Sequence, residues 1–169
     1  ANILKQQPGC LEIRKKLRAA QLKKTSGNTP IANFLGKVTA APFRVTGKSK
    51  IEKNPLKAME EAEKSLSSNP KNPIAGNLLA EAALAAGFPA TAVFARETIF
   101  EFDSSNLPNL KALGQAHLSN GDTENAIRVG NLILKQKAGD AEAQEMLKQA
   151  SVAIALDKGK WEESDDYRE

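Results

Sequence analysis

The sequence has few of the residues on which metalloproteins and disulfide-rich proteins depend. It contains one cysteine, one histidine, one tryptophan and one tyrosine among 169 residues. A single cysteine, Cys10, excludes an internal disulfide and fits a reducing compartment. The single histidine, His117, has no second ligand at metal-binding spacing, so we expect no metal site and place His117 in a core or groove.

Signals for membranes and catalysis are also missing. No apolar run approaches the roughly 18 residues that a membrane-spanning helix needs, and no secretory signal is visible. The chain starts at Ala1 without methionine, so an anchor outside these residues stays open. No Gly-x4-Gly-Lys-Ser/Thr phosphate loop occurs, and Cys10 has no histidine base nearby in the sequence. We therefore expect no enzymatic activity and no cofactor.

Basic residues are unevenly distributed along the chain. The net charge of +4 combines +10 for residues 1–53, with 12 basic and 2 acidic side chains, and −6 for residues 54–169, with 12 basic and 18 acidic ones. The first third is therefore expected to meet an anionic surface or to pack on the rest. It lacks the aromatic ladder and the recognition-helix pattern of nucleic-acid readers, so we expect no nucleic-acid partner.

A repeated stretch organises the rest of the chain. Leu84–Val93 and Leu118–Ile127 match in residue type position by position, and their glycines, Gly87 and Gly121, lie 121 − 87 = 34 residues apart. A fixed period of this length is typical of stacked helix–turn–helix units. The same 34-residue step separates other apolar positions: Leu79 and Leu113, Leu84 and Leu118, Ala92 and Ala126.

Capping and stop signals place the helices. Asn54 and Asp122 are expected to cap the helices that follow them, Pro55 stands at a first helical position, and Gly87 and Gly121 follow last turns. Their buried faces are expected to be rich in alanine and leucine, from Leu56 in the first helix to Leu156 in the last. The polar, acidic tail 158–169, with Trp161 and Tyr167, is expected to be poorly ordered. The predicted helices cover 55–68, 73–86, 89–103, 107–120, 123–137 and 141–157.

A basic helix is predicted over 10–24. Its leucines and Ile13 form an apolar side, while its arginines and lysines form either a solvated face or a footprint for an anionic partner. Pro8-Gly9 aligns with Ala138-Gly139 at an offset of 138 − 8 = 130 residues. The helix is therefore expected to be the first of a repeat whose second helix is 55–68.

Residues 25–53 would then be an insertion between those two helices. This segment is basic and apolar. It either covers the edge of the helical core or lies on a membrane surface or in a partner groove. Its apolar side chains also leave homo-oligomerisation open. The residues expected to carry a surface association are Lys15, Lys16, Phe34, Leu35, Phe43 and Arg44.

The pattern resembles the tetratricopeptide (TPR) repeat family. The family signature runs Trp-x2-Leu-Gly-x2-Tyr, then Ala-x3-Phe, then Pro. The best match is Leu110-x2-Leu113-Gly114-x2-His117 followed by Ala126, within a resemblance that covers about 54–157. No tryptophan stands at the first signature position. Other departures are Arg96 and Gly130 in place of the aromatic residue and Ser104 and Ala138 in place of the proline.

The resemblance implies an all-α, right-handed α-solenoid of antiparallel helix pairs. The first helix of each pair would line a concave groove that binds a peptide or helix of a partner protein. A carboxylate clamp of the chaperone-cofactor kind is not expected, because Ala19 and Glu142 stand where asparagine and lysine are wanted. The groove residues implied by the resemblance are Asn77, Glu81, Lys111, Gln115, Glu145 and Gln149.

We therefore expect a non-enzymatic, cytoplasmic scaffold that binds a protein or peptide partner. Its parts would be a basic region with an insertion (1–53), the helical repeats (54–157) and the tail (158–169). The alternative is a peripheral module that associates with a membrane or another anionic surface through the basic, apolar first third.

Overall fold

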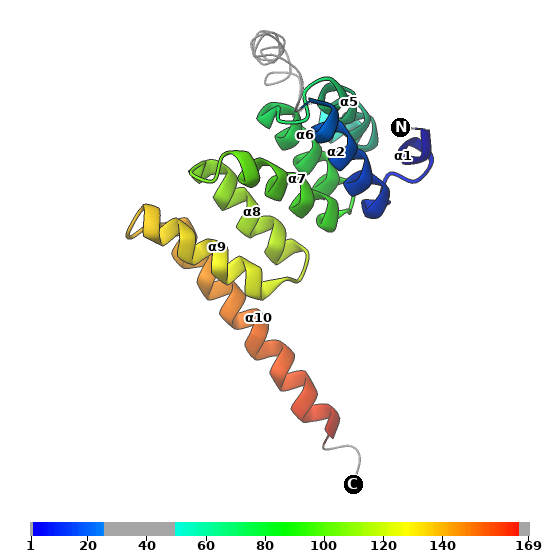
Figure 1. Ribbon diagram of the computed structural model, residues 1–169. Coiled ribbons are helices and arrows are strands. Elements are labelled where there is room, and N and C mark those ends of the chain that lie inside the picture. The colour runs from blue at the N-terminus through cyan, green and yellow to red at the C-terminus, as the bar shows by residue number, and fades with distance from the viewer. Residues whose placement is uncertain (1, 26–49, 166–169) are drawn as a thin grey trace. The chain divides into compact units, whose positions relative to one another are not determined.

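The computed structural model describes residues 2–25 and 50–165, and it describes side-chain burial for 3–25 and 50–157. Within these ranges every named secondary-structure element is an α-helix (Figure 1). The chain divides into two compact units, Ala1–Ser104 and Ser105–Glu169. The division between the two units therefore falls at Ser104, inside the predicted repeat region 54–157, and not at 53 or 157.

The first unit is built on three consecutive helices that pack in order. Helix α5 packs against α6, and α6 packs against α7 (Figure 1). Small side chains dominate their shared core, so the helix axes can approach closely. The core is formed chiefly by Ala58, Ala62, Leu79, Ala82, Ala83, Ala92 and Ile99. The helices of this unit are α1 (Asn2–Gln6), α2 (Leu11–Thr25), α5 (Pro55–Ser68), α6 (Pro73–Ala85) and α7 (Pro89–Phe102).

The second unit repeats the same arrangement of helices packed in sequence order. Its helices are α8 (Leu107–Ser119), α9 (Thr123–Gln136) and α10 (Ala141–Asp165), and α9 packs against both α8 and α10. The buried positions repeat those of the first unit at the 34-residue step, as Ala58, Ala92 and Ala126 do with at most 1% exposure. The period in the sequence is therefore the period of the buried seam, and the predicted all-α repeat architecture is confirmed.

Each of five helices begins with the same capping device. A side-chain oxygen of the residue before the helix accepts a hydrogen bond from a backbone N–H of the first turn, which satisfies a group that would otherwise lack a partner. The N-to-O distances at the closest of these bonds are between 2.9 and 3.2 Å. The capping residues are Asn54, Asn72, Asn106, Asp122 and Asp140.

Left-handed glycines close three of the turns. Gly87, Gly121 and Gly139 have φ values of 79°, 74° and 77°, and no other residue with positive φ occurs in the described ranges. Glycine adopts this region without the steric cost that a Cβ atom imposes. The prediction that Gly87 and Gly121 end helices is confirmed.

Two predictions of buried leucines and one helix end are wrong. Leu56 is 47% exposed, because it lies at the rim of a hollow in the first unit. Leu156 is 62% exposed and lies late in α10, whose 25 residues extend beyond the 14 residues of α9 (Figure 1). Helix α10 runs to Asp165 rather than ending at 157, since residues 158–165 contain no proline and only one glycine.

Helix α2 is attached through charged side chains rather than through its leucines. Its buried residues are Arg14 and Arg18, which donate to the two oxygens of Glu63 on α5 at 2.8 and 3.0 Å. Arg14 also donates to the hydroxyl of Thr91 on α7 at 3.1 Å. The expected apolar pairing of this helix with 55–68 is therefore replaced by an ion-paired contact.

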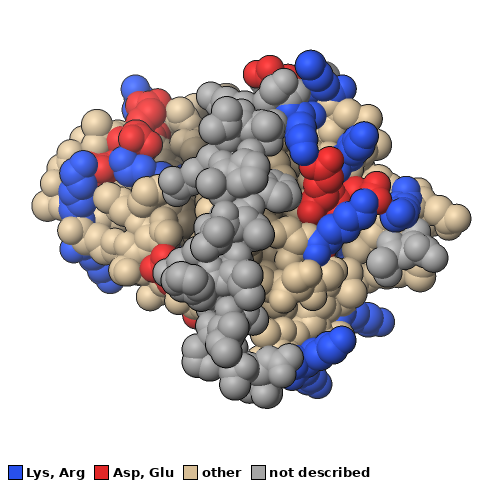
Figure 2. All heavy atoms as spheres, turned by 90° about the horizontal axis from the view of Figure 1, so that it is seen from above, with Lys and Arg blue, Asp and Glu red and all other residues tan. Residues whose placement is uncertain are grey.

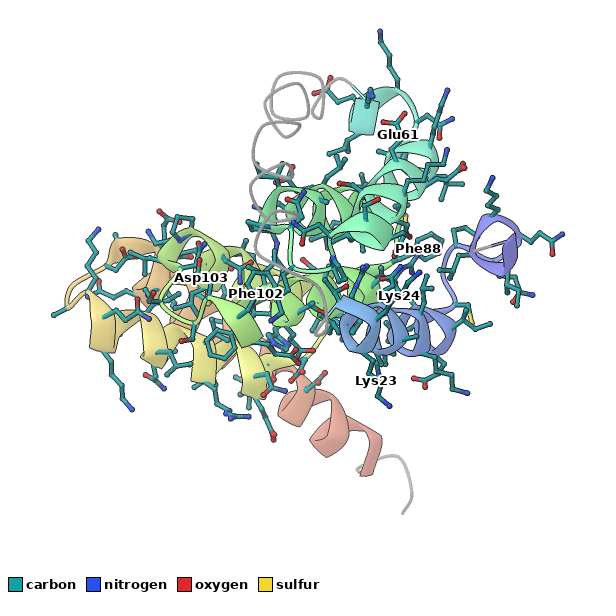
Figure 3. The ribbon with its side chains drawn as sticks, turned by 45° about the horizontal axis from the view of Figure 1, so that its top comes forward. Lys23, Lys24, Glu61, Phe88, Phe102 and Asp103 are labelled. Atoms are coloured by element: carbon teal, nitrogen blue, oxygen red, sulfur yellow. The ribbon has the colours of Figure 1, made fainter. Side chains whose placement is uncertain are left out.

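The turn before α2 contacts α7 as well. A Cβ atom on Gly9 would lie 2.8 Å from Cε1 of Phe88, the residue labelled at the start of α7 in Figure 3. Only a residue without a side chain leaves room for that ring. The N-terminal region is thus part of the first unit.

Candidate functional site

A hollow of about 530 Å³ opens in the second unit between α8 and the start of α10. Helix α8 supplies Lys111 and Gln115, and α10 supplies Glu142 and Met146. Apolar side chains complete the lining, namely Leu107, Pro108 and Ala112. The surface therefore offers apolar contact area next to groups that can hydrogen-bond a polypeptide.

Helical periodicity brings the α8 residues together. Positions 107, 111 and 115 follow one another at four-residue spacing, so their side chains lie on one face of the helix. The Asn106 cap fixes where α8 begins, with Asn106 Oδ1 accepting from the Asn109 N–H at 2.9 Å. The cap thus fixes the start of α8 at Leu107, the first of these three positions.

Lys111 is held by two carboxylates of the chain itself. Its Nζ lies 3.0 Å from Asp140 Oδ2 and 2.8 Å from Glu142 Oε1. These two acceptors raise the pKa of Lys111, with the hydrogen bond to Glu142 as the largest cause. An ammonium has three N–H donors, so a partner carboxylate would meet a lysine whose charge is already balanced by two carboxylates of the chain.

Asp140 links the hollow to the start of α10. Its side chain is buried, and its Oδ1 accepts from the Ala143 N–H at 3.2 Å. The hydrogen bond from Lys111, assisted by the backbone bond and by Lys137 at 3.2 Å, lowers the pKa of Asp140 to about 2. The carboxylate is thus ionised at neutral pH and fixes both the helix start and the lysine.

Two of the four groove residues predicted in this unit line the hollow. Lys111 and Gln115 do, whereas Glu145 and Gln149 lie exposed on α10, where Gln149 Nε2 donates to Glu145 Oε1 at 3.2 Å. Glu145 and Gln149 lie one 34-residue step after Lys111 and Gln115. Helix α10 turns a different face toward the hollow than α8 does, so the equivalent positions of the two helices do not both line it. The residues that sequence reasoning missed are Glu142 and Met146, which lie three positions earlier on α10.

The other two predicted groove residues, Asn77 and Glu81, lie on α6 in the first unit. Arg96 of α7 donates to Asn77 Oδ1, and its Nη2 lies 3.6 Å from Glu81 Oε1. Burial lowers the pKa of Arg96, and Glu81 opposes that effect. The position of the signature aromatic residue is therefore occupied by an arginine that engages both predicted groove residues.

The residues predicted for surface association are described only in part. Lys15 and Lys16 are exposed on α2, and Lys15 pairs with Glu12 at 3.3 Å. Phe34, Leu35, Phe43 and Arg44 lie outside the described residues. On the face seen in Figure 2, basic side chains lie beside acidic ones in several places. Within 2–25 and 50–165 no helix combines the length and apolarity needed to cross a bilayer.

His117 belongs to the interior of the second unit. Its side chain is buried, and Nδ1 lies 3.1 Å from Asp122 Oδ2, the cap of α9. Among the described residues, no three His, Cys, Asp or Glu side chains are placed to hold a metal ion. The histidine is therefore part of the packing around a helix start.

Comparison with solved structures identifies the fold. The chain is similar to the first TPR domain of Spaghetti (RPAP3), solved with the HSP90 peptide SRMEEVD. The TM-score is 0.59 at 20% identity, over 69% of this chain and 95% of that chain. Neither protein-family models nor curated protein sequences match the chain. The helix order, the buried seam and this structural likeness together show that the chain has the helical-repeat fold of a tetratricopeptide-repeat domain.

Proposed function

We propose that this protein is an interaction scaffold that binds a segment of a partner protein in the hollow between α8 and α10. The observation that carries the proposal is that Lys111 and Gln115, which the resemblance to the TPR family assigns to a groove, line an open hollow with apolar neighbours. A TPR domain of similar fold was solved with a bound peptide. Helical-repeat surfaces of this kind bind extended chains or helices without chemistry of their own.

The hollow favours a segment that offers hydrogen-bond donors over one that offers a terminal carboxylate. Lys111 already has two carboxylate partners, while Glu142 is 69% exposed and can accept from a partner as well. Gln115 can both donate to and accept from a peptide backbone. Apolar side chains of the segment would lie on Leu107, Pro108 and Ala112.

Site-specific crosslinking tests this proposal. A photo-crosslinking amino acid at Gln115 is expected to capture a partner from extracts of the native host. The same amino acid at Lys135, an exposed position on α9 outside the hollow, is the matched control. Adding Ala112→Arg should abolish capture at Gln115, because the longer side chain fills the hollow.

Comparison of crosslinking at the two positions decides whether the partner binds in the hollow. Capture that is equal at positions 115 and 135, or that survives Ala112→Arg in a protein with an unchanged helical spectrum, would show that the partner binds elsewhere.

A further inference from the structure

A second hollow, of about 600 Å³, lies in the first unit beside α5. One wall is a stripe of α5 residues at helical spacing, from Leu56 through Glu60 and Glu63 to Ser67, and the other wall comes from α1 and α2. The stripe spans 67 − 56 = 11 residue steps, which is about 16 Å at the helical rise, or three helical turns. We call this hollow the α5 trough and define it by Leu4, Leu17, Leu56, Lys57, Glu60 and Lys64.

The trough is open because α2 does not cover α5 with apolar side chains. In a helix pair of the repeat type, the first helix buries the leucine stripe of the second. Here the long side chains of Arg14 and Arg18 bridge to Glu63. Leu56 consequently stays 47% exposed at one end of the stripe, beside the buried face that Ala58, Met59, Ala62 and Leu66 form.

The charge around the trough is positive. Its lining contains Lys5, Arg14, Lys57 and Lys64 against Glu60 and Glu63, which is 4 − 2 = +2. Glu60 is shared by Lys5 at 3.1 Å and Lys64 at 3.2 Å, and these two hydrogen bonds lower the pKa of Glu60. Lys57 is exposed and forms no ion pair with any residue that the structure describes.

We propose that the α5 trough binds an amphipathic helix of a partner protein, with apolar side chains toward Leu56 and acidic side chains toward the lysine rim. This is a second binding surface, separate from the hollow between α8 and α10. Charge decides between the candidate occupants. The chain's own segment 26–49 contains Lys37, Arg44 and Lys48 and no acidic residue, so it would repel the rim. A second copy placed trough against trough would bring two positive rims together.

Two synthetic helical peptides serve as probes. Both have about 18 residues, enough for an appreciable helix, with leucines on one face. One has glutamate on the flanking positions and the other has lysine. Fluorescence anisotropy with the full chain is expected to show at least tenfold tighter binding of the glutamate peptide. Its affinity should fall as salt is added, because the contacts at the rim are exposed.

Substitutions in the trough change the affinity in both directions. Leu56→Ser should lower the affinity for the glutamate peptide about fivefold or more, since a leucine contact is lost. Lys57→Glu should weaken it by about two- to tenfold. Glu60→Gln should strengthen it about two- to fivefold, because it releases Lys5 and Lys64 for the partner. A variant that fails to fold would bind the peptide less tightly, so a higher affinity of Glu60→Gln cannot be explained by loss of folding.

Matched controls lie on α10. Leu156→Ser and Lys148→Glu replace residues that are as exposed as those of the trough and should leave binding unchanged. Ala112→Arg, which blocks the other hollow, should also leave it unchanged, so the two proposals fail independently.

Several results would overturn the proposal. Equal binding of the two peptides, or glutamate-peptide binding indifferent to Leu56→Ser, would exclude a site of this chemistry. A tenfold rise in affinity on deleting residues 30–44 would identify the chain's own segment as the occupant. If the chain self-associates in sedimentation and Leu56→Ser abolishes that self-association, the occupant of the trough is a second copy of the chain.

Discussion

Gly114 and Met146 approach so closely that a Cβ atom on the glycine would overlap the methionine sulfur. Gly114 belongs to α8 and Met146 to α10, and Met146 also lines the hollow between these helices. The missing side chain on one helix therefore sets how deep the methionine of the other can lie. This pair therefore shapes the part of the proposed binding site that Met146 lines.

We expect Gly114→Ala to change binding more than stability. Met146 is flexible, and its terminal atoms can swing into the adjacent hollow, while alanine favours the helix over glycine by about 0.5–1 kcal/mol. The free energy of unfolding in urea should change by less than about 1 kcal/mol. Crosslinking at Gln115 should nevertheless fall. Adding Met146→Ala should restore it, whereas a double variant that still fails to crosslink would contradict the link between the two residues.

Gly130→Ala should behave differently. A Cβ atom there would lie 2.9 Å from Cδ2 and 3.0 Å from Cγ of Leu147, and the branch carbon cannot move without moving the whole side chain. We expect a loss of about 1–3 kcal/mol in unfolding free energy, the usual cost of overpacking. Urea unfolding of Gly130→Ala beside Gly114→Ala gives the comparison. Equal stability of the two variants would show that α9 and α10 can separate without cost.

Glu63→Gln should loosen α2. It removes the carboxylate that faces Arg14 and Arg18, whose side chains are 1% and 4% exposed, so two buried guanidinium groups lose their charged partner. Breaking a buried ion pair costs about 3–5 kcal/mol. Hydrogen exchange in α2 should accelerate selectively.

Glu12→Gln is the control for that experiment. It removes a pair with Lys15 on the surface of the same helix, which is worth about 0–1 kcal/mol. If Glu12→Gln released α2 as much as Glu63→Gln does, the ion pairs to α5 would not be what holds the helix.

Asp140 makes the second unit sensitive to acid. Its pKa is lowered to about 2 in the folded chain from an ordinary value of 3.8. A lowered carboxyl pKa adds stability that is complete above about pH 4 and is lost as the pH falls toward 2. Asp140→Asn should therefore lower the thermal midpoint at pH 7, and the difference from the natural chain should shrink toward pH 2–3. Asparagine can still cap α10, so a difference independent of pH would rule out the charge as its cause.

The helices were predictable because their signals are local. Asn54, Asn72, Asn106 and Asp122 mark helix starts within a few residues of the chain, and the left-handed glycines mark the turns. The 34-residue step gave the buried seam, since each repeat meets its neighbour in the same way.

The site was predictable only in part, because it depends on which residues face one another across helices. The Lys111–Glu142 pair spans 31 residues, and the Arg14–Glu63 pair spans 49. No local pattern distinguishes the buried Arg14 from the exposed Lys15 beside it. The same limit explains why Leu56 was predicted to be buried: its periodicity is that of a core residue, but the helix beside it presents arginines.

The contact between α2 and α7 has a consequence for the order of folding. Arg14 and Thr91 are 77 residues apart, whereas the helices of the repeats contact their neighbours in sequence. Closing so long a loop costs more entropy than closing a turn, so we expect α2 to dock after its neighbours have formed. During synthesis at about 5–20 residues per second, the basic helix leaves the ribosome about 4–15 s before Thr91 does. Glu63, the partner of both arginines on α5, lies 49 residues after Arg14 and leaves earlier, so the ion pairs to α5 can form before the bond to Thr91.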